Sequence, residues 1–256
     1  MSDMKRNNIL RLAGVAAVVC IMLLTSCKGR YKELPFGGMN GRVQKVTVWH
    51  YMPEMWYAGN TGTDIMYVNS SAYDIRGNEI CSAVMDSAQR IQAETENVFE
   101  DGVCARSIQK QGGRVVARLH LMVRKADMLV YNKEVNGKRV QMTVKETRFG
   151  RRYKSVVSED GKTVLSSVIE TDSEGYPLKI TTDNILTGVK SVETNTFDKK
   201  HNVIEKHVKS SDNTVEEITY TEYSVFDEHG NWTEARTYNR LRLPSEVIFR
   251  DIEYWD

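Results

Sequence analysis

The chain has 256 residues, enough for one large domain or two small ones, and its charges nearly cancel, with 35 Lys+Arg against 34 Asp+Glu. This balance argues against a nucleic-acid binder, which usually carries a strong basic excess. A hydrophobic fraction of 41%, with 12 Tyr, 6 Phe and 4 Trp, excludes wholesale disorder, and only 4 Pro exclude a proline-rich low-complexity chain.

Residues 1–26 have the layout of an export signal. Lys5, Arg6 and Arg11 form a basic start, and the uncharged, mostly apolar run 12–24 follows. A helix of about 13 residues extends only about 20 Å, which is too short for a hydrocarbon core of about 30 Å. The segment therefore predicts a signal peptide rather than a transmembrane anchor.

The end of this segment, Leu24-Thr25-Ser26-Cys27, resembles the lipobox of bacterial lipoproteins. In that family the Cys thiol is diacylglycerated, the bond before it is cut, and the new amine is acylated. The resemblance implies that Cys27 is the first mature residue and anchors the protein in the outer membrane, since each buried methylene adds about 0.8 kcal/mol. An ordinary signal peptide that contains a Cys is the alternative.

Residues 27–41 are expected to be a tether, because they are polar, contain Gly and Pro, and lack apolar periodicity. Some lipoproteins of Bacteroidota carry an acidic signal for surface export after the Cys, whereas Lys28-Gly29-Arg30 is basic here. By this resemblance the protein faces the periplasm, with the cell surface as the alternative.

From residue 42 to 256 one rhythm repeats, a strand-like run of about eight residues followed by a turn rich in Asp, Asn and Gly. This rhythm predicts an antiparallel all-β domain. The turn candidates are Asp74–Gly77, Asp86–Ser87, Glu100–Gly102, Gly112–Gly113, Asn136–Gly137, Gly150, Glu159–Gly161, Asp172–Gly175, Asp183–Asn184, Asp198–Asn202, Ser211–Asn213, Asp227–Asn231 and Asn239–Arg240.

Several strands carry apolar residues on both faces, as in 245–255, whereas a compact sandwich would sort the faces more cleanly. We therefore expect a long meander of hairpins that forms an open, twisted sheet. Its edge strands would be able to accept a partner strand. The segment 83–97 has a weak helical stripe, but a hairpin through Asp86–Gln89 fits the surrounding rhythm better.

The turns share the pattern aromatic-D-x-x-G-N, as in Tyr73-Asp74 and Phe226-Asp227. Successive turn positions lie 26 residues apart from Asp172 to Asp198 and 29 apart from Asp198 to Asp227, which is two strands per repeat. The Asp is expected to bind backbone N–H groups of the turn, and the Gly to adopt the left-handed conformation.

These turns resemble the YD repeats of RHS-type proteins, and the ending Phe226–Arg236 with Arg250–Tyr254 resembles small RHS/YD-repeat-like lipoproteins of Bacteroidota. The opening Gly41–Val46 also matches their first strand. The resemblance covers residues 41–256 but departs in 103–157. It implies a hairpin meander. The large RHS proteins wind many repeats into a shell, and about seven repeats are too few for that function to carry over.

Constellations for catalysis or metal binding are scarce. The chain contains no HExxH, no G-x-S-x-G and no nucleotide-binding glycine loop. His201, Glu205 and His207 fall within one turn and strand, with His229 as a conceivable third ligand, but exposed turn histidines are common. We predict no catalytic residue, no metal and no cofactor.

Two further features concern single residues. Cys81 and Cys104 lie in consecutive repeats and either form a disulfide or remain small buried side chains. The segment 49–57 gathers Trp49, Tyr51, Trp56 and Tyr57, which either bind a sugar or peptide or cover the exposed end of the sheet.

The sequence thus predicts a membrane-anchored envelope lipoprotein that acts as a non-enzymatic scaffold or binding surface. Its partners would be the lipid membrane through acylated Cys27 and an envelope protein or glycan, but not nucleic acid. One alternative is a carbohydrate- or peptidoglycan-binding protein that uses the aromatic segment. A second is an envelope enzyme whose site is assembled from distant strands.

Overall fold

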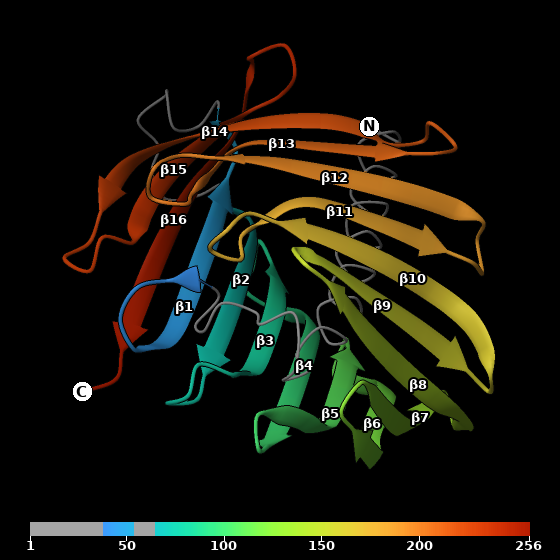
Figure 1. Ribbon diagram of the computed structural model, residues 1–256. Helices are drawn as coiled ribbons and strands as arrows, with labels where there is room; N and C mark the ends of the chain where they lie inside the picture. Colours follow the sequence, from blue (N-terminus) through green and yellow to red (C-terminus); the bar gives the residue numbers. More distant parts are fainter. Residues whose placement is uncertain (1–37, 54–64) are drawn as a thin grey trace.

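The computed structural model describes residues 38–53 and 65–256, and over these residues the chain forms a closed barrel of antiparallel strands (Figure 1). The all-β prediction is confirmed. The strands are β1 (Val43–Tyr51), β2 (Ile65–Tyr73), β3 (Glu79–Asp86), β4 (Ile91–Glu100), β5 (Val103–Gln111), β6 (Arg114–Lys125), β7 (Met128–Val135), β8 (Lys138–Phe149), β9 (Arg152–Glu159), β10 (Lys162–Thr171), β11 (Pro177–Asn184), β12 (Val189–Phe197), β13 (Val203–Ser210), β14 (Glu216–Phe226), β15 (Trp232–Tyr238) and β16 (Pro244–Tyr254).

The expected open, twisted sheet is wrong, because the first and last strands pair. Val46 lies opposite Ile252 and His50 opposite Ile248, and Figure 1 shows the blue strand β1 beside the red strand β16. Closure pairs the N–H and C=O groups that two sheet edges would leave exposed. The barrel therefore offers no edge to which a partner strand could add, and it has no sheet end for the segment 49–57 to cover.

Aspartate side chains organise the tight turns as the motif predicts. After β2, Asp74 Oδ1 accepts the N–H groups of Arg76 at 2.9 Å and Asn78 at 3.0 Å. Asp198 and Asp227 accept the corresponding N–H groups in the turns after β12 and β14. Gly230 adopts a φ of +82°, in the left-handed region that a residue without Cβ tolerates.

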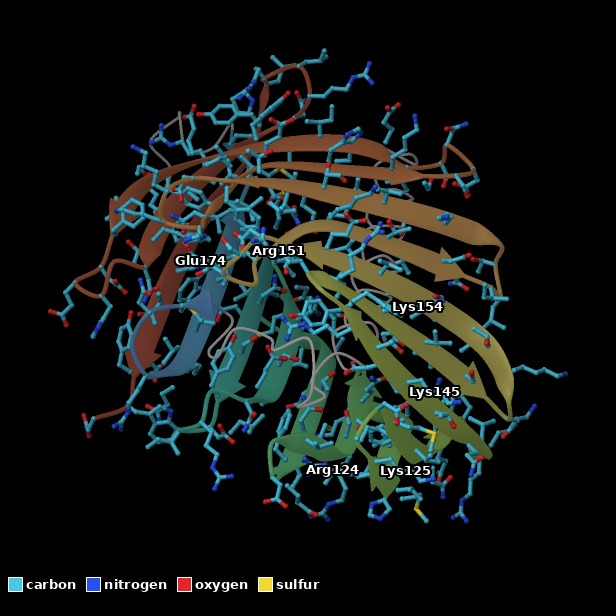
Figure 2. The ribbon with its side chains drawn as sticks, viewed as in Figure 1. Arg124, Lys125, Lys145, Arg151, Lys154 and Glu174 are labelled. Carbon is cyan, nitrogen blue, oxygen red and sulfur yellow. The ribbon has the colours of Figure 1, made fainter. Side chains whose placement is uncertain are left out.

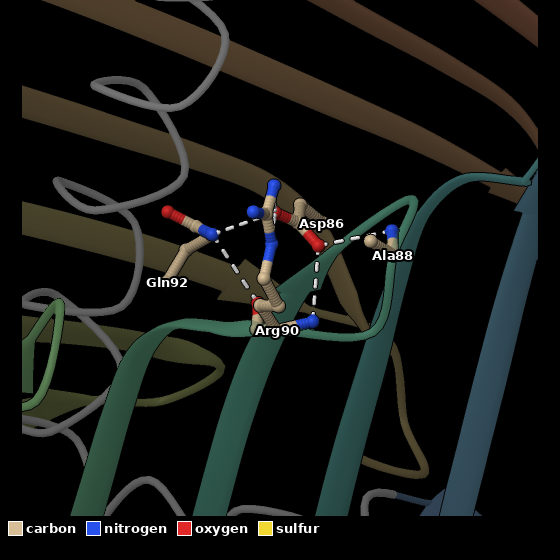
Figure 3. Close-up of polar contacts among 4 residues, drawn as sticks. All are labelled: Asp86, Ala88, Arg90 and Gln92. Atoms are coloured by element: carbon tan, nitrogen blue, oxygen red, sulfur yellow. Dashed lines mark hydrogen bonds and ion pairs between the residues drawn. The ribbon is translucent and has the colours of Figure 1, made fainter.

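The segment 83–97 is a hairpin, as expected, and contains no helix. Asp86 Oδ1 accepts the N–H groups of Ala88 at 3.0 Å and Arg90 at 2.9 Å (Figure 3). Gln89 takes the left-handed conformation with a φ of +59°. The same Asp-led turn thus forms here without a glycine.

The turns lie on two rims of the barrel. The rim that we name the terminal rim also holds both ends of the described barrel, residue 42 and residue 255, because every even-numbered strand ends there. Its turns are 74–78, 101–102, 126–127, 150–151, 172–176, 198–202 and 227–231. The opposite rim holds the turns 87–90, 112–113, 136–137, 160–161, 185–188, 211–215 and 239–243. The turn at 126–127 is the one that is not among the turn candidates predicted from the sequence.

The two faces of the wall differ in burial, and this difference identifies the inner face. Strand pairing places Tyr131 opposite Met142 and Val144 opposite Val157, all on one face and all at most 4% exposed. Side chains crowd on the concave side of a curved sheet and spread apart on the convex side. This face is therefore the inner one, since interior and exterior positions alternate along each barrel strand.

Two clusters of buried apolar residues lie on the inner face, rather than one continuous core. One joins β5 and β7 to β9 through Val103, Leu129, Tyr131, Met142, Val144 and Val157. The other joins β1 and β2 through Val43, Val46 and Tyr73, and Met39 packs against it. Met39 therefore belongs to the folded body, although the sequence places it in the tether.

Candidate binding site on the inner face of the barrel

The outer face of the barrel is charged around its circumference. Ion pairs join neighbouring strands on this face, and none of their side chains points toward the lumen. They are Lys45–Glu253 at 3.0 Å, Glu94–Lys110 at 3.1 Å, Arg118–Glu134 at 3.6 Å, Arg152–Glu170 at 2.7 Å and Lys209–Glu216 at 3.7 Å. A lipid-facing barrel instead presents an apolar band about 25 Å tall. Within the described residues, no helix is long and apolar enough to cross a membrane.

An apolar patch interrupts this charged face at β1, β2 and β16. Trp49 on β1 lies opposite Val68 and Phe249, and the rings of Tyr51 and Phe249 meet edge to face at 5.5 Å. Val68 and Val247 are 2% exposed although they lie on the outer face. Two of the four predicted aromatic residues thus share a small outer patch. Trp56 and Tyr57 lie outside the described residues.

The inner face carries an arginine that is stacked on an aromatic ring. Arg250 lies opposite Val48 in the seam between β16 and β1, and its Cζ lies 3.4 Å from the centroid of the Trp232 ring. Tyr223 extends the aromatic surface, with its ring centroid 5.2 Å from that of Trp232. The Tyr223 hydroxyl donates to the carbonyl of Val203 at 2.8 Å, which fixes the orientation of the ring.

Arg250 has no counter-ion among the described residues. It forms no ion pair there, and its buried Nε has no hydrogen-bond partner. Burial lowers the pKa of the guanidinium to about 10, so the group stays charged at neutral pH. Burial likewise raises the pKa of the Tyr223 phenol to about 12, so Tyr223 supplies no compensating negative charge. Buried charges are normally paired, and an anion is therefore the ligand chemistry that suits this site.

A hydrogen-bond network beside this site closes the barrel. The Asn231 side chain accepts from the Asn40 N–H at 2.7 Å and donates to the Asn40 carbonyl at 2.9 Å. It also donates to the Tyr254 hydroxyl at 2.7 Å, and that hydroxyl donates to Asp227. The last turn of the repeat thereby holds the segment that precedes β1. These motif residues have a structural role, as the turn chemistry predicts.

A second polar cluster on the inner face surrounds His50. Its Nδ1 lies 3.2 Å from Glu246 Oε2, its Nε2 lies 3.3 Å from Asn69 Nδ2, and its ring stacks on Tyr67 at 4.0 Å. A nucleophile activated by a histidine must hydrogen-bond to a ring nitrogen. Both nitrogens are occupied by other groups, and neither partner is a hydroxyl or thiol. The cluster therefore lacks the arrangement of a covalent catalyst.

The structure does not bring the predicted cysteines together. Cys81 on β3 and Cys104 on β5 are free thiols, and β4 separates their strands. Two strand spacings amount to about 10 Å, which is beyond the Cα separation that a disulfide spans. Burial raises the pKa of Cys104 to about 11, which keeps this thiol protonated.

The histidines considered as metal ligands are also apart. His201 bonds to Glu174 at 2.9 Å and stacks on Tyr176, whereas His229 packs against Tyr254. No group of three or more His, Cys, Asp or Glu side chains that could hold a metal occurs in the described part of the chain.

No protein-family model matches this chain, and no curated protein matches it. Among solved structures, a porin-like protein from Bacteroides uniformis ATCC 8492 has 10% identity and a TM-score of 0.49, covering 84% of this chain and 99% of that one. A porin-like protein from Bacteroides vulgatus ATCC 8482 has 9% identity and a TM-score of 0.40, covering 83% and 98%. A LolA superfamily protein from Nitrosomonas europaea has 12% identity and a TM-score of 0.28, covering 92% and 93%.

Proposed function

We propose that this chain is a lipid-anchored envelope protein whose barrel stands outside the bilayer and binds a small anionic molecule on its inner face, without catalysis. The observation that carries the binding role is Arg250, a partly buried cation without a counter-ion, stacked on Trp232. The resemblance to YD-repeat lipoproteins and the outer-membrane location stay predictions.

The charged outer face supports a barrel that does not embed in lipid. Charged side chains at the middle of a lipid-facing barrel wall cost about 2–4 kcal/mol each for Arg and Lys. Pairs such as Arg118–Glu134 and Arg152–Glu170 would place several such side chains in lipid. Membrane attachment then depends on Cys27, for which the lipobox resemblance is the support.

The chemistry of the Arg250 site favours a carboxylate or a phosphate. A guanidinium presents a planar fork of N–H donors that matches the two oxygens of either group. The rings of Trp232 and Tyr223 add apolar surface beside the cation, which suits a ligand with both an acidic group and C–H faces, such as a sugar acid.

Binding of glucuronate, inorganic phosphate and glucose to the purified protein tests this role by isothermal titration calorimetry. We expect glucuronate or phosphate to bind and neutral glucose not to bind. Arg250→Gln should weaken anion binding at least tenfold, which is about 1.4 kcal/mol. Arg118→Gln removes an arginine of the outer face and is the matched control, with no expected effect.

Equal binding of glucose, or anion binding that survives Arg250→Gln in a protein with unchanged melting, would contradict the proposal. Absence of binding for both anions would also contradict it. Phosphate binding without glucuronate binding would identify the phosphate rather than the carboxylate as the recognised group.

The outer aromatic patch favours a second candidate, glycan binding at Trp49 and Tyr51. Its support is a patch of apolar and aromatic residues from β1, β2 and β16 on the outer face. Trp49→Ala should abolish binding of a neutral oligosaccharide and leave anion binding at Arg250 unchanged. If Trp49→Ala leaves oligosaccharide binding intact, glycan binding at this patch is ruled out.

A further inference from the structure

Five basic side chains lie on β6, β8 and β9 and in the β8–β9 turn, and Figure 2 shows them spread from the β6–β7 turn to the β8–β9 turn. They are Arg124, Lys125, Lys145, Arg151 and Lys154, which we name the basic sector. Arg124 lies opposite Leu129 and therefore on the inner face, whereas the three lysines lie on the outer face. All five are exposed. None forms an ion pair or hydrogen bond through its side chain with another described residue, whereas most charged residues of the outer wall are paired.

Strand pairing makes the lysines neighbours on the outer face. Lys125 on β6 lies opposite Met128, and Met128 lies opposite Lys145 on β8. Lys154 on β9 lies opposite Thr147, two residues along the strand from Lys145. The three ammonium groups therefore project from adjacent positions of the same wall.

Large apolar side chains are exposed in the same sector. Phe149 is 64% exposed, Met122 is 60% exposed and Val123 is 41% exposed. Exposed apolar tips flanked by lysine and arginine are typical of surfaces that rest in the interface of an anionic bilayer, where apolar tips enter the headgroup layer and cations meet the lipid phosphates.

The basic sector lies across the rim from the segment that leads to the proposed anchor. The described chain enters β1 at the terminal rim, where Asn231 holds Asn40. In the closed strand order, β9 is eight strands from β1 in either direction, so the β8–β9 turn lies on the far side of the same rim. The stretch of the barrel from β14 to β1 instead has an excess of acidic side chains near this rim, with Asp227, Glu228, Asp251, Glu253 and Asp256 against Arg42, Lys45 and Arg250.

We propose that the basic sector docks on an anionic lipid surface, so that the terminal rim faces the bilayer and the barrel leans toward β6 to β9. This inference rests on the proposed acylation of Cys27, which brings the rim to the membrane. The acyl chains hold the protein at the membrane, and the basic sector sets its orientation. Trp232 and Tyr254, which lie beside the Arg250 site, are at strand ends on this same rim.

Lysine footprinting of the full-length protein as it is purified from membranes tests this orientation. The protein is reconstituted in phosphatidylcholine vesicles with or without about 30 mol% phosphatidylglycerol, and exposed amines are acetylated and quantified by mass spectrometry. On anionic vesicles we expect Lys125, Lys145 and Lys154 to react at least about threefold more slowly. The protection should be lost in about 1 M salt, where the screening length is about 3 Å.

Lysines of the opposite rim are the internal control. Lys138 and Lys162 are exposed and lie where β8 and β10 begin, so their reactivity should be the same on both kinds of vesicle. The double substitution Lys145→Glu with Lys154→Glu should remove the protection of Lys125. The matched pair Lys138→Glu with Lys162→Glu should leave it unchanged.

Equal reactivity of all five lysines on both vesicles would overturn the proposal, as would protection of Lys138 and Lys162 instead. Inorganic phosphate added to phosphatidylcholine vesicles separates a free-phosphate site from a lipid surface, because protection under that condition would also overturn the lipid assignment. The intact mass of the same sample shows whether Cys27 carries acyl chains. A protein without them that still binds anionic vesicles in a salt-sensitive way would refute the anchor but keep the basic sector.

Discussion

The two rims of the barrel are built from similar hairpins but present different chemistry. Both rims have turns of up to five residues, such as 227–231 on the terminal rim and 239–243 on the opposite rim. The terminal rim carries the unpaired basic sector and, from β14 to β1, an excess of acidic side chains. The tips of the opposite rim instead expose leucines, with Leu186 74% and Leu241 69% exposed. Because each repeat has two strands, equivalent turns lie on the same rim, and the turn sequences of one rim can differ from those of the other without changing the strands. The repeat therefore determines the barrel, and the turn sequences determine the charge and polarity of each rim.

The largest effect is expected from Cys27→Ser, which tests whether the terminal rim is the membrane side. Without the thiol no acyl chain can be added, so labelling with a palmitate analogue should disappear and the protein should leave the detergent-soluble lipoprotein fraction. A Cys27→Ser protein that remains labelled would show that Cys27 is not the acylation site and that the lipobox prediction is wrong.

A large loss of stability is expected from Asn231→Ala, because this side chain ties the terminal rim to the segment before β1. Its removal leaves the Asn40 N–H and carbonyl without their partner and should cost about 2–3 kcal/mol in the free energy of unfolding. Asn202→Ala is the matched control, since Asn202 bonds only within its own turn, and should cost about 1 kcal/mol. Equal losses in urea unfolding would mean that the tie contributes nothing.

Backbone strain should act equally on both rims. Gly230 and Gly161 have φ values of +82° and +80°, and a β-branched residue is strained in that region. Gly230→Val and Gly161→Val should each destabilise by on the order of 1–2 kcal/mol. A Cβ at Gly230 would lie 3.7 Å from the Asn40 amide, which is an ordinary contact, so a markedly greater loss there would reveal a further constraint on the terminal rim.

The smallest expected effect is a change in how Tm depends on pH below pH 4. For Asp227, burial opposes ionisation, but hydrogen bonds from Tyr254 and the turn N–H groups outweigh it and lower the pKa. The folded state then holds this proton less tightly than the unfolded state, so the stability that Asp227 adds is present above the unfolded pKa near 4 and is lost as pH falls below it. Asp227→Asn should therefore flatten the decline of Tm below pH 4 by on the order of 2 °C.

On the opposite rim, hydrogen bonds from Arg90, first its backbone N–H, lower the pKa of Asp86. Asp86→Asn is the comparison for the acid profile. Asp86 takes no part in closing the barrel, so its effect on the profile should be the smaller one. A larger effect for Asp86→Asn would indicate that the turns of the opposite rim respond more strongly to protonation.

Local chemistry could be predicted from the sequence, and long-range geometry could not. The Asp-led turns at 74, 198 and 227 follow from short-range hydrogen bonds that the motif itself specifies. Closure of the barrel depends on the stagger of the hydrogen-bond register, which accumulates over all the strand pairs, and no single residue indicates that the sheet will close. The expectation of an open sheet therefore failed although the turns were located correctly.

The same limit applies to the candidate site. Arg250 shares one face of its strand with Ile248 and Ile252, which is an ordinary mixture for a strand. Only the pairing of β16 with β1 and β15 shows that this face is the inner one and that Trp232 lies within reach. The aromatic segment was the stronger sequence signal, yet Trp49 and Tyr51 lie on the outer face.

The seam between β1 and β16 has a consequence for the order of folding. β1 is synthesised first, but it can pair with its second neighbour, β16, only after that last strand has been made. The Asn40–Asn231 contact likewise joins residues 191 positions apart. Contacts of such long range are formed late and slowly. The barrel therefore cannot close until almost the whole chain is available. Until then β1 exposes an unpaired edge, which favours aggregation and makes the fold vulnerable to truncation at its last strand.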